Sequence, residues 1–344
     1  MHCFRLIERL TFFSCECFAL VLPLCFTVLA TDSGESTYGA YKHVFIIGID
    51  GAGTFFEKDY MENFHRIFAD GAVKYGARTE TKTDSGPNWT SILTGVSYFK
   101  HGAENGVVDG DQKRVFKRYP SIFSVVHDAM PDAELASINN WASINIGIVE
   151  DDIGATKITV GPDSATVDAI VNYFNEGHAP AVFFTQLDEV DGAGHAYGSS
   201  SKEYEEAMKA ADGYIGTIYD CLEENGLLED GLFIVTADHG HKATGGHGRF
   251  SKIESYSTIA VKGKTVVAGG SMDSDVKLRD IAAISLYALG VKPTEWSFSA
   301  RVPGNLFTDV KGQVRPYYRD ITDLICGTFM WIYTNLGHPL DEYF

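Results

Sequence analysis

Three short, largely apolar runs constrain the fold more than any other feature of this sequence. They are 43–49 (HVFIIGI), 181–187 (AVFFTQL) and 232–237 (LFIVTA). Strands that are apolar on both faces are typical of a parallel sheet covered by helices on both sides. Segments with helical periodicity alternate with such runs, and no repeat or low-complexity linker interrupts residues 40–310. We therefore predict one continuous α/β domain with a mostly parallel central sheet and helices on both faces.

The clearest helix is predicted to begin at Ser200 and to end at Asn225-Gly226. Glu203 follows Ser200 at the spacing of a capping box, and an Asn-Gly pair is typical of a helix end. Apolar residues recur between these ends at helical spacing, which indicates packing against the core. We infer no function for this helix.

Residues 1–30 are typical of an export signal. Arg5 and Arg9 precede an apolar run over 18–30, and the small residue Ala30 ends it. The run is shorter than the roughly 20 residues that a spanning helix requires. We expect cleavage near Ala30, a secreted, periplasmic or extracellular location and no firm membrane anchor; an uncleaved anchor is the alternative.

Charge and cysteine content exclude several classes of protein. The net charge of −18 and the pI of about 4.9 argue against binding to nucleic-acid polymers or anionic membranes, which need a basic face. An anionic ligand would therefore need local positive charge. Outside residues 1–30 the chain keeps two cysteines, Cys221 and Cys326, so one disulfide can form but a disulfide scaffold cannot.

Carboxylates and imidazoles follow each of the three apolar runs. Asp50 follows the first, Asp191 and His195 lie just past the second, and Asp238 and His239 follow the third. Because ligands bind beyond the carboxyl ends of parallel strands, we expect these side chains to converge at one edge of the sheet. Mixed oxygen and nitrogen ligands favour zinc, with manganese as the alternative.

Two glycine-rich motifs carry further candidate ligands. DGAGH is expected to form a short turn that directs Asp191 and His195 toward one point, and GGHG supplies His247. Taken singly, each aspartate can be a turn or helix cap and each histidine a surface or satisfied core residue. Their joint clustering favours a metal site.

The segment 81–95 (TKTDSGPNWTSILTG) is the candidate for the reacting group. Ser85 precedes Gly86-Pro87, and a helix is expected to begin near Asn88. The positive end of a helix dipole supports bound phosphate, and a nearby divalent ion lowers the pKa of a hydroxyl enough to make it a nucleophile. A simple N-cap serine is the alternative interpretation, and Thr83 is the competing nucleophile.

Five motifs together resemble the alkaline phosphatase superfamily and, within it, the type I phosphodiesterase/nucleotide pyrophosphatase group. In the family's order they are GIDG (48–51), TKTDSGPNWTSILTG (81–95), DEVDGAGHAYG (188–198), TADHG (236–240) and GGHG (245–248). The resemblance covers about residues 43–307. It implies an alkaline phosphatase-like three-layer sandwich and two divalent metal ions, with zinc favoured.

The resemblance also assigns roles by position. Ser85 takes the place of the nucleophile and Asn88 that of a phosphate-binding asparagine. The sulfatase branch is disfavoured because neither remaining cysteine lies in a Cys-x-Pro-x-Arg setting. The implied ligand sets are Asp191, His195 and His247 for one ion, and Asp50, Ser85, Asp238 and His239 for the other.

The implied activity is hydrolysis of a small phosphorylated substrate through a phospho-Ser85 intermediate. We expect phosphodiester or nucleotide pyrophosphate bonds to be cleaved in preference to monoesters, because a neutral Asn88 suits a monoanion better than a dianion. Arg249 or Lys242 would favour a phosphomonoesterase instead. A phosphomutase, a phosphonate hydrolase and a catalytically silent secreted metal-binding module would each fit the same set of residues.

The expected domain layout follows from these assignments. Residues 31–310 form the catalytic domain, in which 98–180 supply pocket walls. Only seven residues separate His239 from His247, where the nucleotide pyrophosphatases usually carry a long insert, which weakens the substrate assignment. The tail 311–344 receives no function. The candidate substrate contacts are Asn139, Asn140, Trp141 and Arg249, although core packing explains the first three nearly as well.

Overall fold

The structure, a computed structural model, covers most of the predicted catalytic domain. It describes residues 36–80, 82–110, 118–270, 272, 275–293 and 298–310. The predicted signal segment, Cys326 and the tail 311–344 lie outside the described residues. Within the described part of the chain, every helix is too short or too polar to cross a membrane.

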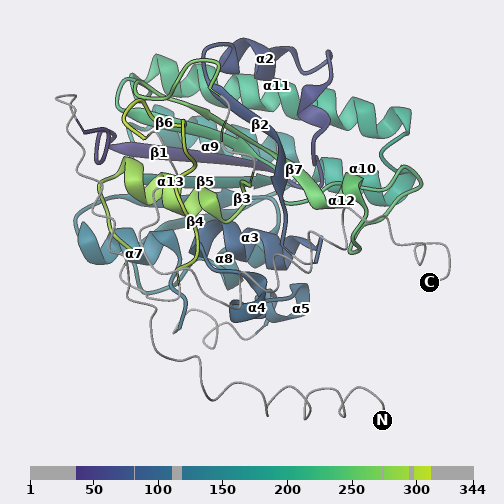
Figure 1. The fold of residues 1–344 in the computed structure, drawn as a ribbon, viewed down its shortest axis with the longest axis horizontal. Helices are drawn as coiled ribbons and strands as arrows, with labels where there is room; N and C mark the ends of the chain where they lie inside the picture. Colours follow the sequence, from purple (N-terminus) through teal and green to yellow (C-terminus); the bar gives the residue numbers. More distant parts are fainter. Residues whose placement is uncertain are drawn as a thin grey trace, which may run out of the picture. The chain divides into compact units, whose positions relative to one another are not determined.

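A single sheet with seven strands forms the centre of the described fold (Figure 1). Its order is β2-β7-β6-β1-β5-β3-β4, and β7 alone runs antiparallel to its neighbours. The prediction of a mostly parallel sheet is confirmed. The strands are β1 His43–Ile49, β2 Ala72–Arg78, β3 Leu135–Asn139, β4 Thr156–Thr159, β5 Val182–Leu187, β6 Gly231–Thr236 and β7 Tyr256–Lys262.

The three predicted strands are β1, β5 and β6, which lie side by side at the middle of the sheet. β1 pairs in parallel with both others, so that Ile49 is level with Leu187 and Gly48 with Thr236. All three strands therefore end at the same edge. This register places Asp50 beside the segments that follow β5 and β6.

Helices cover both faces of the sheet, as predicted, and alternate residues of β1 supply the two cores. Val44 packs into the core beneath α3, α7 and α13, whereas Phe45 packs into the core beneath α2, α9 and α11 (Figure 1). The described helices are η1 Phe55–Glu57, α2 Glu62–Phe68, α3 Ser85–Thr94, α4 Tyr98–His101, α5 Asn105–Val108, α7 Ile122–Ala129, α8 Ala142–Gly147, α9 Asp163–Asn175, α10 Glu189–Tyr197, α11 Lys202–Glu224, α12 Lys252–Ser255 and α13 Asp280–Ala288.

The long helix α11 begins slightly later than its sequence pattern predicts. Its N-cap is Ser201, whose hydroxyl accepts the Tyr204 N–H, so the predicted capping box between Ser200 and Glu203 is wrong by one residue. The predicted end is confirmed, since Asn225 is the C-cap and Gly226 has a φ of 71°.

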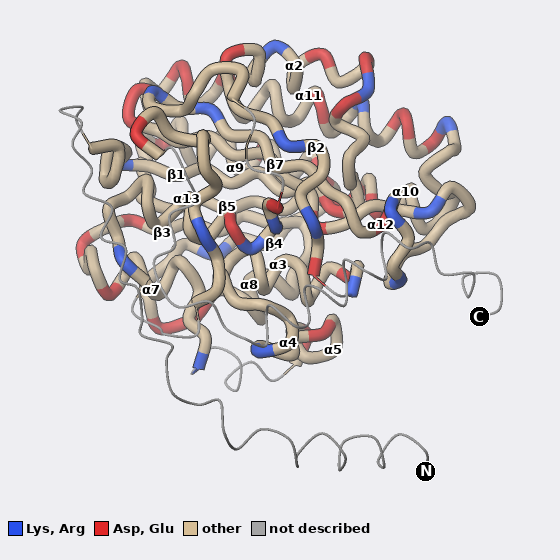
Figure 2. Tube along the Cα trace, viewed as in Figure 1, with Lys and Arg blue, Asp and Glu red and all other residues tan. Residues whose placement is uncertain are grey.

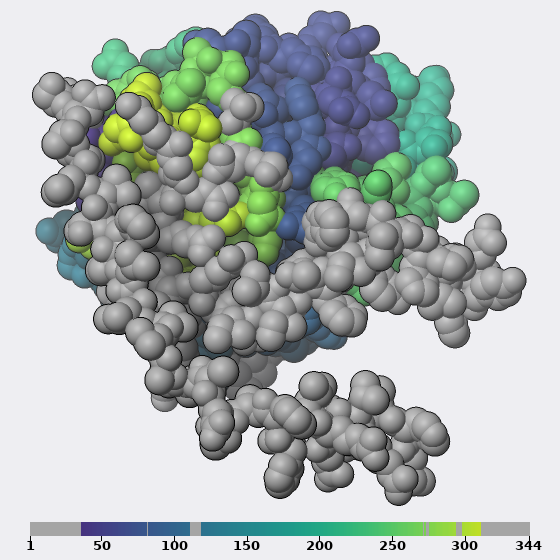
Figure 3. Space-filling model, in the orientation of Figure 1, coloured from purple at the N-terminus to yellow at the C-terminus, as the bar shows by residue number. Residues whose placement is uncertain are grey.

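Two further features concern the distribution of charged residues and the packing of residues 298–310. Figure 2 shows lysine and arginine positions interspersed with aspartate and glutamate positions. Residues 298–310, yellow in Figure 3, lie beside green residues of the segment that follows β7. An antiparallel bridge between Val266 and Phe307 joins the two segments.

Candidate active site

Ser85 is the first residue of α3, three positions before the predicted helix start. Its hydroxyl donates a hydrogen bond to Asp50 Oδ1 (3.3 Å) and lies 3.2 Å from His239 Nε2. Ser85 is 8% exposed, while both partners are fully buried. The structure thus brings the predicted nucleophile together with two members of its implied ligand set.

Thr83, the competing nucleophile, has a different environment. Its hydroxyl donates to the Arg249 carbonyl (2.9 Å) and accepts the Gly248 N–H (2.8 Å). The side chain is fully buried. Thr83 therefore links the nucleophile segment to the loop after β6, and its hydroxyl hydrogen is already engaged.

Asn88 does not have the predicted role of binding phosphate. Its side chain is fully buried, and its amide group donates to the carbonyls of Lys82 (2.8 Å) and Asp84 (2.9 Å). Its Oδ1 accepts the Glu80 N–H (2.8 Å). Because both amide hydrogens are used within the loop, Asn88 holds the nucleophile segment in place and offers no donor to a substrate.

A second amide, which the sequence pattern did not reveal, lies beside the nucleophile. The Gly86 N–H donates to Asn105 Oδ1 (2.8 Å), and the Asn105 side chain is exposed. Among the described residues, Asn105 Nδ2 has no hydrogen-bond partner. A Cβ at Gly86 would lie 2.8 Å from Asn105 N, so glycine is what allows this close approach. The glycine directly after Ser85 was the one sequence feature that could have indicated a group packed closely against this turn.

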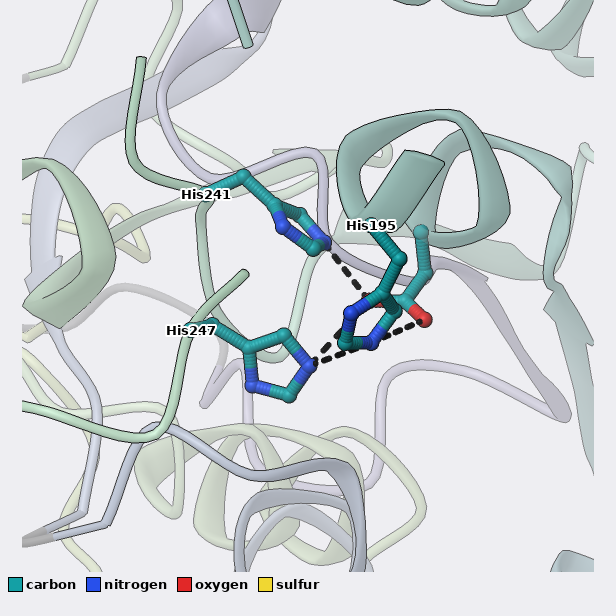
Figure 4. A group of neighbouring side chains, drawn as sticks. His195, His241 and His247 are labelled. Carbon is teal, nitrogen blue, oxygen red and sulfur yellow. Dashed lines mark hydrogen bonds and ion pairs between the residues drawn. The ribbon is translucent and has the colours of Figure 1, made fainter. Parts of the chain in front are cut away.

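Asp191 and His195 lie on a helix rather than on the expected turn. The motif DGAGH belongs to α10, where the two residues are one helical turn apart and His195 Nε2 lies 3.3 Å from Asp191 Oδ2. Figure 4 shows His195 on this helix facing the loop that carries His241 and His247. The helix corrects the predicted local structure but leaves both side chains directed toward one point.

His247 reaches the same point from the loop after β6. Its Nδ1 donates to the Thr83 carbonyl (2.5 Å), so that the Nε2 lone pair faces His195 Nε2 (3.0 Å) and Asp191 Oδ1 (3.5 Å). Ligand atoms about 2.0–2.1 Å from a tetrahedral zinc ion are roughly 3.3 Å apart. These separations fit three ligands of one ion, the set that the family resemblance implies.

His241 is a further histidine that the sequence pattern did not single out. Its Nε2 lies 2.7 Å from Asp191 Oδ1, which is short for two ligands of one tetrahedral ion and normal for a hydrogen bond. The ring is fully buried and fills a space left by two glycines. A Cβ at Gly194 would lie 2.4 Å from the His241 ring, and one at Gly51 would lie 2.9 Å from it. His241 therefore fixes the orientation of Asp191.

Two fully buried carboxylates make up most of the other ligand group. Burial, together with the charges of Asp238 and Asp191, raises the pKa of Asp50 well above its usual range, and burial raises that of Asp238 to about 7. Asp238 Oδ2 has no hydrogen-bond partner in the described part of the chain.

His239 completes this group. Burial, together with the charge of His247, lowers the pKa of the His239 ring well below its usual range, so the ring is neutral and has a lone pair to offer. Two buried carboxylates beside a neutral imidazole require a cation to remain ionised, and a divalent metal ion fits them. The candidate groups are Asp50, Asp238 and His239, and Asp191, His195, His241 and His247.

The segment after β3 contacts the site indirectly. Asn139 is fully buried, and its Oδ1 accepts the Gln186 N–H (2.8 Å). Asn140 donates to Asp163 Oδ1 (2.7 Å), and the Trp141 N–H donates to Gln186 Oε1 (2.9 Å). This segment thus holds β5 and α9 in place. A substrate contact by Trp141, which is partly exposed, stays a prediction.

With this geometry established, comparison with known proteins identifies the family. The sequence matches the family model described as type I phosphodiesterase / nucleotide pyrophosphatase over residues 44–293. The chain belongs to this family. Among family relatives, bis(5'-adenosyl)-triphosphatase ENPP4 from Homo sapiens is 27% identical over 252 residues, which is 64% of this chain and 52% of the relative.

Two other proteins extend the comparison. GPI ethanolamine phosphate transferase 1 from Candida glabrata is 25% identical over 301 residues, 72% of this chain and 32% of the relative. The chain thus spans about half or less of the length of these curated relatives. The structure of murine ectonucleotide pyrophosphatase/phosphodiesterase 5 superposes with a TM-score of 0.61 at 13% identity, covering 73% of this chain and 95% of that one. The predicted alkaline phosphatase-like fold is confirmed.

Proposed function

We propose that this chain hydrolyses small phosphoric esters, cleaving phosphodiester or nucleotide pyrophosphate bonds with Ser85 as the nucleophile. The observation that carries this proposal is the position of Ser85 Oγ, within 3.3 Å of Asp50 Oδ1 and 3.2 Å of His239 Nε2. Membership of the phosphodiesterase family supports it. So does the name of the relative ENPP4, which is a triphosphatase acting on a bis(5'-adenosyl) compound.

The proposed cofactors are two divalent metal ions, with zinc favoured by the mixture of imidazole and carboxylate ligands. When bound, they would lower the pKa of the Ser85 hydroxyl and neutralise charge on the phosphate. One ion would be held by Asp191, His195 and His247, and the other by Asp50, Ser85, Asp238 and His239.

The chain's own groups account for the remaining steps. Ser85 Oγ attacks phosphorus in line, the bond to the leaving oxygen breaks, and phospho-Ser85 forms; water then cleaves the new P–O bond and restores the serine. Ser85 also lies at the N-terminus of a ten-residue helix, where the dipole favours an anion. We assign the phosphate-binding amide to Asn105 in place of Asn88, because Asn105 Nδ2 is free among the described residues.

A neutral amide beside the nucleophile favours a diester monoanion over a monoester dianion. We therefore retain the proposed preference for diesters, with phosphomonoesterase activity as the alternative if the Arg249 side chain contacts the substrate. The ratio of kcat/KM for bis-p-nitrophenyl phosphate to that for p-nitrophenyl phosphate decides between them. A ratio well below one that Arg249→Ala reverses would favour the monoesterase.

The nucleophile itself is tested by Ser85→Ala. We expect hydrolysis of bis-p-nitrophenyl phosphate to fall by more than about 10³-fold, while metal content is largely retained. Mass spectrometry of wild-type protein acid-quenched during turnover of this diester should find a p-nitrophenyl phosphoryl group on Ser85, because only one p-nitrophenol leaves in the first step. Ser124→Ala on α7 is the matched control and should leave the rate unchanged. Full activity of Ser85→Ala would contradict the covalent mechanism, whereas a wild-type protein that binds metal and hydrolyses neither substrate would favour the silent metal-binding module.

Export and the binding partner are part of the same proposal. The signal-like residues 1–30 support a secreted, periplasmic or extracellular protein that acts on a small phosphorylated substrate, with residues 98–180 supplying pocket walls. N-terminal sequencing of the protein recovered outside expressing cells tests the export step. We expect the sequence to begin near Thr31.

A further inference from the structure

Gln186, near the end of β5, makes hydrogen bonds with both of its amide atoms. Its Oε1 accepts the Trp141 N–H (2.9 Å), which fixes the orientation of the amide group. Its Nε2 donates to Asp50 Oδ2 (3.0 Å) and to Asp188 Oδ1 (2.7 Å). Gln186 is fully buried, so each of these bonds is shielded from water. The residue thus connects the segment after β3 to the ligand group that contains Asp50.

Trp89, on the first turns of α3, donates to the same carboxylate oxygen. The distance from its Nε1 to Asp50 Oδ2 is 2.8 Å, and the side chain is fully buried. Its ring occupies the space next to Gly48, where a Cβ would lie 2.4 Å from the ring, and it packs edge-on against Phe184. The indole is therefore held in one position, with its N–H directed at Asp50.

The two donors leave the oxygens of Asp50 in different environments. Oδ2 accepts two N–H groups, whereas Oδ1 faces Ser85 Oγ at 3.3 Å and His239 Nε2 at 3.5 Å. We propose that Trp89 and Gln186 are positioning residues that occupy Asp50 Oδ2 and so present Oδ1 to the ion shared with Asp238 and His239. This inference rests on the metal dependence of the proposed function.

The neutrality of both donors matters for this role. A cationic partner would cancel the charge of Asp50 and weaken its attraction for a divalent ion. Indole and amide N–H groups orient the carboxylate, and favour its ionised form, without adding positive charge. Hydrogen-bond partners of metal ligands typically change metal affinity by about 10–100-fold when removed.

The test measures zinc affinity by chelator competition in Trp89→Phe and Gln186→Met. Both variants keep most of the side-chain volume and remove one donor to Oδ2. We expect affinity for one of the two ions to fall by about 10–100-fold while the other ion binds as in the wild type. Asp238→Asn identifies the affected ion, because it should lose that ion, and the absorption of bound Co²⁺ gives a second readout.

Two further observations separate positioning from a general loss of structure. Trp141→Phe, the same substitution at a tryptophan that contacts Gln186 through its backbone, should leave both affinities unchanged. Excess zinc should restore kcat in Trp89→Phe and Gln186→Met. Wild-type affinity for both ions in these two variants, or an equal loss of both ions, would overturn the positioning role alone. A wild-type protein that binds no ion at Asp50, Asp238 and His239 would overturn the proposed function as well.

Discussion

At the scale of single residues, small side chains decide which larger ones can reach the site. Gly86 admits Asn105, Gly48 admits Trp89, and Gly194 admits the ring of His241. In a linear sequence these glycines indicate turns or backbone flexibility. The structure shows that here they supply space, which depends on a partner far away in the chain.

Gly194→Ala tests this use of space. Alanine favours a helix over glycine by about 1 kcal/mol, so on propensity alone the variant should be more stable. The new Cβ would lie 2.4 Å from the His241 ring, however, and must displace it from Asp191. We expect loss of one bound zinc ion, measured by elemental analysis of the purified protein.

Gly192→Ala is the matched control, since it lies on the same helix and its Cβ would meet no atom within 4 Å. This variant should keep both ions. Equal metal content in the two variants would show that the position of the His241 ring beside Gly194 has no role in metal binding.

The sequence predicted which side chains would converge where the ends of strands determine their position, and it did not do so where long-range packing determines it. Asp50, Asp191 and Asp238 were predictable because they follow buried strands of a parallel sheet. The family resemblance assigned phosphate binding to Asn88 by its position in the motif, whereas the amide with a free donor among the described residues is that of Asn105. No sequence pattern states that Asn88 uses both amide hydrogens within its own loop.

At the scale of elements, α10 shows why local patterns can mislead. Two glycines in DGAGH predict a turn, yet the segment is helical. Its first N–H groups, those of Asp188 and Glu189, donate to the carboxylate of Asp163 (2.8 and 3.0 Å), which begins α9. A cap supplied from a distant helix satisfies donors that the local sequence leaves open. The sequence cannot reveal such a cap without the tertiary fold.

His101, the last residue of the short helix α4, is bonded through both ring nitrogens, and its protonation is expected to lower the stability of the fold. His101 Nδ1 accepts the Ala103 N–H (3.0 Å), and its Nε2 lies 2.8 Å from Ser91 Oγ on α3. Burial, with the nearby Arg279, lowers the pKa of His101 from 6.5 to about 3. Between these values the unfolded chain binds a proton that the folded chain does not, so stability falls as the pH falls.

We expect His101 to lower the free energy of unfolding by about 1.4 kcal/mol for each pH unit below pH 6.5. Urea unfolding at pH 7.5, 6.5 and 5.5 measures it, and His101→Gln should show a correspondingly shallower dependence. His65→Gln, at an exposed position on α2, should behave like the wild type. Identical slopes for His101→Gln and the wild type would assign the acid sensitivity to other groups.

At the scale of the whole molecule, the site draws on strands that are distant in the chain and adjacent in the sheet. β1 lies between β5 and β6, and both ligand groups follow the ends of these strands. The three strands and their common edge were predictable from apolar runs. The full strand order was not, because it depends on crossovers that leave no pattern in the sequence.

This arrangement predicts that metal ions stabilise the entire domain. Each ion at about 1,000 times its dissociation constant adds about 4 kcal/mol, which corresponds to roughly 8–16 °C per ion in the melting temperature of a domain this size. Differential scanning calorimetry with zinc and with EDTA should show a shift of this order. Asp238→Asn should reduce the difference between the melting temperatures with zinc and with EDTA. It removes a ligand, which weakens metal binding, and it relieves the repulsion between buried carboxylates in the metal-free protein. A melting temperature that does not respond to EDTA would argue against metal binding.

The bonds between Thr83 and residues 247–249 have a consequence for exchanging parts between relatives. The backbone and hydroxyl of Thr83 together make three hydrogen bonds to that loop, and one of them sets the tautomer of His247. A chimera that received only one of the two segments would lose this match between donor and acceptor, even with every ligand residue retained. The segment that contains Thr83 and the loop 247–249 should therefore be exchanged together. A graft that moves both should keep the proton of His247 on Nδ1 and the lone pair on Nε2.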